Sequence, residues 1–245
     1  MFFNKKEFSS YWFATGTPTF LIEQIRKRND LERFIEQRTA DSSFLRGLDN
    51  NKISNMGLLF QTGYVTVKKK EIGEDDTPQY TIDFPNMEVK KAFIGNLLEE
   101  YIKKEPSEVQ SINNILAEAL KEKNKESLER GLTELFANIP YGLATEKESY
   151  YHSLFLLAAR MSGYEVEGEV HTNKGRIDAV LKKDDNVIIV EIKYSKEKTI
   201  DKMIEEAMGQ IKNKKYYEKY SGNDISLLAI VFGDKKEIGC KFQKP

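Results

Sequence analysis

The sequence has very few of the side chains that build disulfides and transition-metal centres. One cysteine, Cys240, and two histidines, His152 and His171, occur among 245 residues. A lone cysteine excludes an intrachain disulfide and a cysteine zinc cluster, and two histidines leave little for a histidine-based metal site. Any catalysis must therefore rely on carboxylates, lysines and hydroxyl groups.

Net charge is also almost absent, because 38 Lys and Arg residues face 39 Asp and Glu residues, for a net charge of -1. This balance excludes a polycationic protein that wraps nucleic acid, so any contact with phosphates must come from a local patch. No apolar run approaches the ~18–20 residues of a membrane span, and no secretory leader follows Met1. We expect a cytoplasmic protein that does not associate with a membrane.

Residues 1–140 predict a mainly helical, winged-helix-like module. Apolar residues at three- and four-residue spacing indicate helices at 19–28 and 30–38. Two β-rich segments, 64–67 and 79–84, flank a charged, turn-prone stretch and predict a hairpin. Three amphipathic helices should follow, at Met87–Lys103, Ser107–Glu122 and Lys125–Asn138.

A change of pattern near Ile139-Pro140-Tyr141-Gly142 predicts a second domain at residues 141–245. The expected order is an apolar helix, three strands, a long helix and two strands, which together form a compact α/β unit. These elements are expected at 146–161, 164–170, 176–181, 187–194, 199–220, 225–232 and 237–242. We therefore expect a two-part α+β protein.

The chemistry concentrates on the hairpin formed by the second and third strands of this unit. Side chains alternate between the two faces of a strand, so Glu191 and Lys193 share one face. A turn centred on Asp184-Asp185 would pair Asp178 directly with Glu191, with Cβ atoms about 4.5–5.5 Å apart. Two facing carboxylates repel, and such a pair raises a pKa or recruits a cation. Carboxylate oxygens suit Mg²⁺, which also binds water and substrate phosphate.

Gly175-Arg176-Ile177-Asp178, followed on the next strand by Ile189-Val190-Glu191-Ile192-Lys193, resembles the PD-(D/E)XK nuclease superfamily. The segments Glu206–Tyr216 and Tyr11–Pro18 are similar to the bacterial subgroup in which the nuclease domain follows an AAA-ATPase-like domain. Residues 1–140 would then resemble the tail of that ATPase-like region. No G-x-x-x-x-G-K-[ST] loop occurs in the chain, so we do not expect ATP binding.

The resemblance implies a restriction-endonuclease-like core with a mixed central sheet, and it implies roles for individual residues. Asp178 and Glu191 would bind Mg²⁺, for which Mn²⁺ can substitute, and the carbonyl of Ile192 would be a further ligand. Lys193 would orient or activate the attacking water and balance charge on the phosphate. Two further residues match the family, Glu148 as a metal ligand and Gln210 as a side chain near phosphate or metal-bound water. The implied activity is metal-dependent hydrolysis of nucleic-acid phosphodiester bonds, with DNA favoured over RNA, and residues 1–140 would position nucleic acid or dock a protein partner or a second copy.

Each of these residues also has a structural interpretation. Asp178, Glu191 and Lys193 could form an inert charge network on an exposed sheet face, although their apolar neighbours argue against that. Glu148 completes a capping box with Thr145 at the start of a helix, and Gln210 could be an exposed helix residue. The rival hypothesis for the whole chain is a catalytically silent nuclease-like module that binds nucleic acid or protein.

Overall fold

The computed structural model describes residues 22, 39–42, 55–73, 75–137, 148–172, 175–196, 198–233 and 237–245. Within these ranges the side chains of residues 55, 148–150, 169–176 and 216 are outside the description. The helices predicted at 19–28 and 30–38 lie outside the described residues, apart from Ile22. The chain forms two compact units, Met1–Leu97 and Leu98–Pro245. Among the described residues, no helix is both long and apolar enough to cross a membrane.

The first unit contains a three-stranded antiparallel sheet with the strand order β1-β3-β2. Its described elements are β1 (Thr39–Asp41), α3 (Asn55–Gln61), β2 (Thr66–Ile72), β3 (Pro78–Asp83) and the first part of α4 (Met87–Ile102). The predicted hairpin is confirmed, but β2 continues through the charged segment that the sequence assigned to the turn. This extension is physically inexpensive, because Lys68, Lys69 and Lys70 remain exposed on an outer strand. The winged-helix-like topology stays a prediction.

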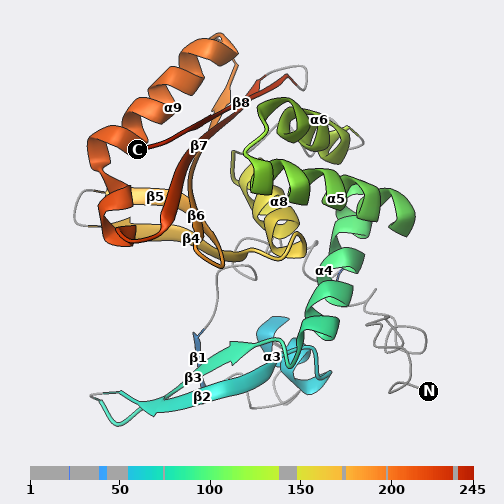
Figure 1. Cartoon of the computed structure of the whole chain (residues 1–245). Helices are drawn as coiled ribbons and strands as arrows, with labels where there is room; N and C mark the ends of the chain where they lie inside the picture. Colours follow the sequence, from blue (N-terminus) through green and yellow to red (C-terminus); the bar gives the residue numbers. More distant parts are fainter. Residues whose placement is uncertain are drawn as a thin grey trace. The chain divides into compact units, whose positions relative to one another are not determined.

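The second unit is built on a five-stranded mixed sheet with the order β4-β5-β6-β7-β8, in which β6 and β7 are parallel and the other pairs antiparallel. Figure 1 shows α9 on one face of this sheet and α8 on the other. The predicted mixed sheet and order of elements are confirmed. The elements are α8 (Glu148–Met161), β4 (Glu165–Thr172), β5 (Gly175–Lys183), β6 (Asn186–Ser195), α9 (Ile200–Lys214), η4 (Tyr216–Tyr220), β7 (Asp224–Gly233) and β8 (Ile238–Gln243).

The long helix expected at 199–220 is interrupted near its end. Helix α9 stops at Lys214 because Lys215 adopts a left-handed conformation, with φ of 48°. The short 3-10 helix η4 follows, and its Tyr220 is buried in the apolar layer beneath α9. The left-handed residue is a lysine, so the glycine that commonly marks a helix end is missing from the sequence here.

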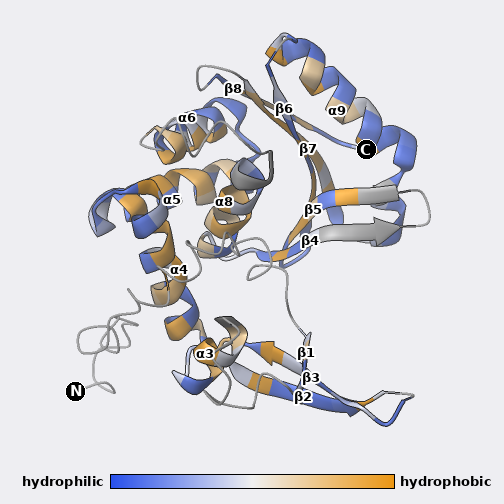
Figure 2. Ribbon diagram, turned by 180° about the vertical axis from the view of Figure 1, so that it is seen from behind, coloured by the Kyte–Doolittle hydropathy of each residue, from blue (hydrophilic) through white to orange (hydrophobic). Residues whose placement is uncertain are grey.

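Apolar side chains from α9 and the central strands form one layer of the core. From α9 it takes Met203, Ile204, Ala207, Met208 and Ile211, and from β6 it takes Val187 and Ile189. The rest of α9 is exposed or partly buried, and in Figure 2 the helix carries both blue and orange segments while α8 is largely orange. Strand β6 is buried from Val187 to Ile192, so the sheet between α8 and α9 is fully covered at its centre.

The helices predicted between residues 87 and 138 are confirmed, and two of them begin at residues with a clear local signal. They are α4 (Met87–Ile102), α5 (Pro106–Glu122) and α6 (Lys125–Phe136). Proline at the first position of α5 has a backbone geometry suited to a helix start. Asn124 caps α6 by accepting the N–H of Ser127 at 2.8 Å. Gly131 lets α6 approach α5 closely, because a Cβ there would lie 2.7 Å from Cδ2 of Leu116.

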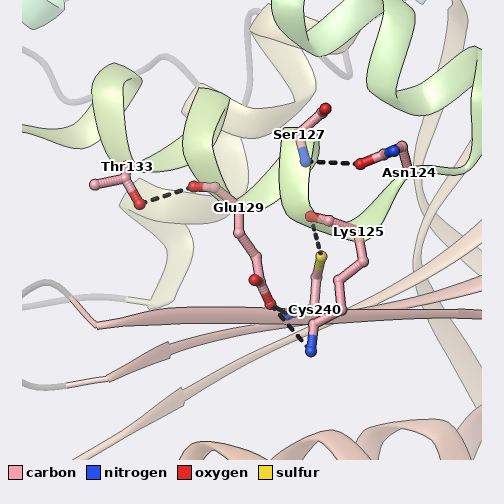
Figure 3. A network of polar contacts seen from close by, with 6 residues as sticks. All are labelled: Asn124, Lys125, Ser127, Glu129, Thr133 and Cys240. Carbon is pink, nitrogen blue, oxygen red and sulfur yellow. Dashed lines mark hydrogen bonds and ion pairs between the residues drawn. The ribbon is translucent and has the colours of Figure 1, made fainter.

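Helix α6 is hydrogen-bonded to the outer strand β8. The Glu129 carboxylate accepts the backbone N–H of Cys240 at 2.9 Å, as Figure 3 shows, and the Lys125 carbonyl accepts the Cys240 thiol. The ring of Phe136 also packs against Phe232 of β7, with centroids 5.0 Å apart. An outer strand presents unpaired backbone groups, and Glu129 satisfies one of them.

The two compact units divide inside α4, between residues 97 and 98. The domain boundary that the sequence indicates at residue 140 stays a prediction. Helices α5 and α6 belong by their packing to the unit that contains the mixed sheet. An amphipathic stripe indicates which face of a helix is buried, but it does not indicate which partner covers that face.

Candidate active site where two strands separate

The candidate site lies where β5 separates from β6. Their antiparallel ladder runs from the turn, where Lys183 pairs with Asn186, to the pair Ala179 and Val190. The predicted register is confirmed over this stretch, but the ladder ends one pair before the expected pairing of Asp178 with Glu191. Instead, Oδ2 of Asp178 accepts the backbone N–H of Ile192 at 2.8 Å. The carboxylate takes the place that a strand carbonyl would have, which lets the strands separate without leaving that N–H unpaired.

Glu191 lies on the α9 side of β6, on the same face as Val187 and Ile189, and it has no exposed surface. Its Oε1 accepts a hydrogen bond from Nζ of Lys193 at 2.6 Å. Its Oε2 is buried and has no hydrogen-bond partner among the described residues. Burial, and then the nearby charge of Asp178, raise the pKa of Glu191, while the bond from Lys193 opposes the rise.

Two lysines act on this buried carboxylate. The side chain of Lys193 is 24% exposed, so it reaches from the covered sheet toward solvent while it holds Glu191. Lys214, in the last turn of α9, is partly buried, and its positive charge also lowers the pKa of Glu191. The site thus combines two carboxylates with two positive charges.

The structure brings together Asp178, Glu191, Ile192 and Lys193, as the sequence predicted. Gln210 is partly buried on α9, between residues that pack on β6, and its role stays a prediction. Glu148 is the first residue of α8, but its side chain lies outside the described residues. For Glu148 the choice between helix capping and metal binding therefore remains open.

Sequence reasoning did not connect His152 with the site. His152 lies on α8 and is 7% exposed, and its Nε2 lies 2.9 Å from the backbone carbonyl oxygen of Asp178. A carbonyl can only accept, so Nε2 carries the proton and donates it to this bond. The bond gives a polar group of this buried histidine a hydrogen-bond partner. Nothing in the sequence indicated that its partner would be Asp178.

The donor set can be compared with what a hard cation requires. Within the described ranges, no three His, Cys, Asp or Glu side chains form a group that could hold a metal ion. Mg²⁺, however, is commonly bound by one or two carboxylates and several waters. The pair Asp178 and Glu191 meets that requirement, and the buried oxygen Oε2 of Glu191 is a group whose charge a cation would offset. The residues present therefore fit Mg²⁺ or Mn²⁺.

Residues 146–242 match the family model of the PD-(D/E)XK nuclease superfamily. The matched segment begins just before α8 and ends within β8, so it contains nearly all of the mixed sheet, all of α9 and every candidate site residue. The match agrees with the resemblance that the strand motifs carry. It does not extend to the upstream AAA-ATPase-like region, which stays a prediction.

A longer relative covers the rest of the chain. The uncharacterized protein in the vnfD 5′ region of Azotobacter chroococcum mcd 1 is 32% identical over 240 residues, which is 95% of this chain. The chain spans 45% of the length of that relative. The similarity therefore includes residues on both sides of the segment that matches the family model.

Proposed function

We propose that the chain hydrolyses phosphodiester bonds of nucleic acid, with DNA as the favoured substrate, in a reaction that requires Mg²⁺ and accepts Mn²⁺. The observation that carries this proposal is the environment of Glu191. Its carboxylate is completely buried, one oxygen has no described hydrogen-bond partner, and a second carboxylate lies close enough to raise its pKa. An arrangement that raises the energy of the free protein in this way is typical of a site that binds a cation.

The ligands would come from both separated strands. Asp178 has one carboxylate oxygen engaged by the Ile192 N–H, which leaves Oδ1 for a cation, and Glu191 contributes Oε2. The carbonyl of Ile192 and the carboxylate of Glu148 would complete the set. When bound, the cation lowers the pKa of a water molecule and offsets the charge that develops on the phosphate.

The remaining residues would manage charge and orientation. Lys193 donates to Oε1 of Glu191 and is 24% exposed, which supports the proposal that its ammonium group would orient the attacking water and neutralise a phosphate oxygen. Gln210 and Lys214 are four residues apart on α9 and thus share one helix face, from which they would contact the phosphate backbone.

The test is cleavage of single-stranded, duplex and branched DNA with Mg²⁺ or Mn²⁺. The wild-type chain is compared with Asp178→Asn and Lys193→Met, and with matched controls at the exposed Asp185 and Lys202. We expect cleavage that requires the metal, is lost in the two site variants and persists in Asp185→Asn and Lys202→Met.

Two results would contradict the proposal in different ways. Cleavage that survives in Asp178→Asn would show that the activity does not come from this site. Absence of cleavage in every protein, together with absence of Mn²⁺ binding in calorimetry, would favour the catalytically silent binding module. RNA substrates assayed in parallel decide whether DNA is preferred.

A further inference from the structure

We infer that His152 is a positioning residue of this site, which fixes Asp178 by holding its backbone carbonyl. This inference rests on the proposed function for its catalytic consequence, but the geometry behind it is independent. The side chain comes from α8, on one face of the sheet, whereas Glu191 lies on the other face, under α9. Asp178 lies between them, at the point where β5 leaves β6.

The separation of the strands creates the need for such a residue. Beyond Ala179 the ladder between β5 and β6 stops, and the polar groups of Asp178 need partners that are not supplied by regular strand pairing to β6. The carboxylate bonds to the Ile192 N–H at 2.8 Å, and the carbonyl accepts from Nε2 of His152 at 2.9 Å. A buried carbonyl without a partner is costly, so a donor from α8 stabilises the separated geometry.

The position of His152 in α8 makes this role specific. Every residue from Tyr151 to Arg160 is buried, and most are apolar. Packing alone would favour an aliphatic side chain at residue 152, because burying an imidazole costs free energy unless it is hydrogen-bonded. Arg160 of the same helix also donates to a backbone carbonyl, that of Val166, at 3.1 Å. Two buried polar residues of α8 therefore bond to backbone carbonyls in strands of the sheet.

The consequence for the site is that Asp178 is held at two points, by α8 through its main chain and by β6 through its side chain. With both bonds in place, the second carboxylate oxygen has one defined position relative to Glu191. Loss of the bond from His152 frees the main chain of Asp178, and the two carboxylates then no longer keep a fixed separation. Groups that orient metal ligands in this way typically change metal affinity or activity roughly 10–100-fold when removed.

The experiment compares His152→Leu, which removes the donor, with His152→Gln, whose amide nitrogen can occupy the place of Nε2. Three quantities are measured: Mn²⁺ affinity by calorimetry, kcat and KM for DNA cleavage, and exchange of the Ile192 amide proton by NMR. For His152→Leu we expect Mn²⁺ affinity and kcat to fall roughly 10–100-fold, KM to change little, and the Ile192 amide to exchange faster. In His152→Gln, the Mn²⁺ affinity, kcat and the exchange rate of the Ile192 amide should stay close to their wild-type values.

His152→Asn provides a second comparison if His152→Leu does not fold. Its amide reaches the place of Nδ1 but not that of Nε2, so it should behave as a loss of the donor while it stays polar. Equal Mn²⁺ affinity and equal Ile192 exchange in His152→Gln and in the donor-free variant would overturn the inference. So would faster exchange that is spread equally over Val187–Val190 and Ile192, because that pattern indicates a general loss of stability.

The amide measurement also separates this inference from the proposed function. If the wild-type chain neither binds Mn²⁺ nor cleaves DNA, the proposed function fails, and exchange at Ile192 alone decides whether His152 positions Asp178. If the wild type is active and the exchange of Ile192 does not respond to the loss of the donor, the positioning role fails while the nuclease proposal stands.

Discussion

The carboxylate of Asp178 and the backbone amide of Ile192 are joined by a 2.8 Å hydrogen bond at the place where β5 and β6 separate. This bond uses one carboxylate oxygen for structure and leaves the other for a ligand. Asp178 therefore has two roles that substitution can separate, because an asparagine keeps an acceptor oxygen whereas an alanine does not.

The first prediction concerns this separation of roles. Asp178→Asn should unfold at nearly the wild-type urea concentration and yet lose cleavage. Asp178→Ala leaves the amide of the buried Ile192 without its partner, which should lower the free energy of unfolding by about 1–3 kcal/mol. Urea unfolding followed by circular dichroism gives the midpoint and the free energy of unfolding of each variant, with Asp185→Ala as a control at the exposed turn. Equal stability of the asparagine and alanine variants would show that the bond to Ile192 contributes nothing.

The second prediction concerns Glu191, whose pKa is raised by burial and by the charge of Asp178. A carboxyl group with a higher pKa in the folded than in the unfolded chain favours folding at low pH, and this contribution is lost as pH rises through the folded pKa. Glu191→Gln should therefore be more stable than wild type near pH 7 without metal, and this advantage should shrink below the unfolded pKa. The measurement is urea unfolding in EDTA, at pH 7 and at a pH below the pKa of Glu191 in the unfolded chain. If Glu191→Gln is less stable than wild type at pH 7 without metal, the prediction is wrong.

Some of this site could be predicted from the sequence, because local rules fix it. The two-residue period of a strand places Glu191 and Lys193 on one face, and the Asp184-Asp185 turn sets the register with Asp178 close to Glu191. The apolar run of β6 predicts a strand that is buried on both faces, and the structure agrees. These features depend only on neighbours along one hairpin.

Other features depend on contacts between distant segments, and the sequence could not specify them. The ladder ends at Ala179 because Asp178 bonds to Ile192 through its side chain, and a regular pattern cannot indicate such an interruption. The histidine on α8 has no sequence signal for its partner 26 residues away. In the same way, the amphipathic pattern of α6 did not reveal that Glu129 would accept a backbone N–H of β8.

The third prediction tests this hydrogen bond between α6 and β8. Glu129 accepts the N–H of Cys240 on the outer strand β8, and Glu129→Ala should lower the free energy of unfolding by about 1–3 kcal/mol because the partly buried amide loses its partner. Glu129→Gln keeps an acceptor oxygen and should recover most of the loss. Glu126→Ala, which removes an exposed carboxylate from the same helix, is the control in thermal and urea unfolding. If Glu129→Gln is as unstable as Glu129→Ala, charge and not the hydrogen bond is responsible.

The fourth prediction concerns Lys214, whose charge acts on Glu191 from the last turn of α9. If this lysine faces the bound phosphate backbone, Lys214→Gln should reduce the salt dependence of DNA binding by about one unit in the slope of log affinity against log salt. Lys202→Gln, in the exposed first turn of the same helix, should leave the slope unchanged. Fluorescence anisotropy with catalytically inactive Asp178→Asn as the parent protein measures both. Equal slopes for the two lysine variants would place Lys214 outside the nucleic-acid interface.

The last prediction concerns acid stability and Asp224, which begins β7 and links it to two other parts of its unit. Its carboxylate accepts Nζ of Lys123, at the end of α5, at 2.7 Å, and it also accepts Nζ of Lys244. These bonds lower the pKa of Asp224 from 3.8 to about 2. A carboxyl group with a depressed folded pKa stabilises the fold above its unfolded pKa, and this stability is lost as pH falls from about 3.8 through about 2.

Asp224→Asn should therefore be less stable than wild type at neutral pH. This stability difference should narrow as pH falls below 3.8, be mostly lost near pH 2, and vanish below that pH, where both proteins carry a neutral group. The side chain is 51% exposed, so the difference should also shrink in high salt, which screens exposed ion pairs. Urea midpoints at several pH values measure this stability difference between Asp224→Asn and wild type. Asp185→Asn is the control for loss of one exposed carboxylate. A difference that stays constant from neutral pH to pH 2 would mean that lost packing, and not the ion pairs, explains the effect of the substitution.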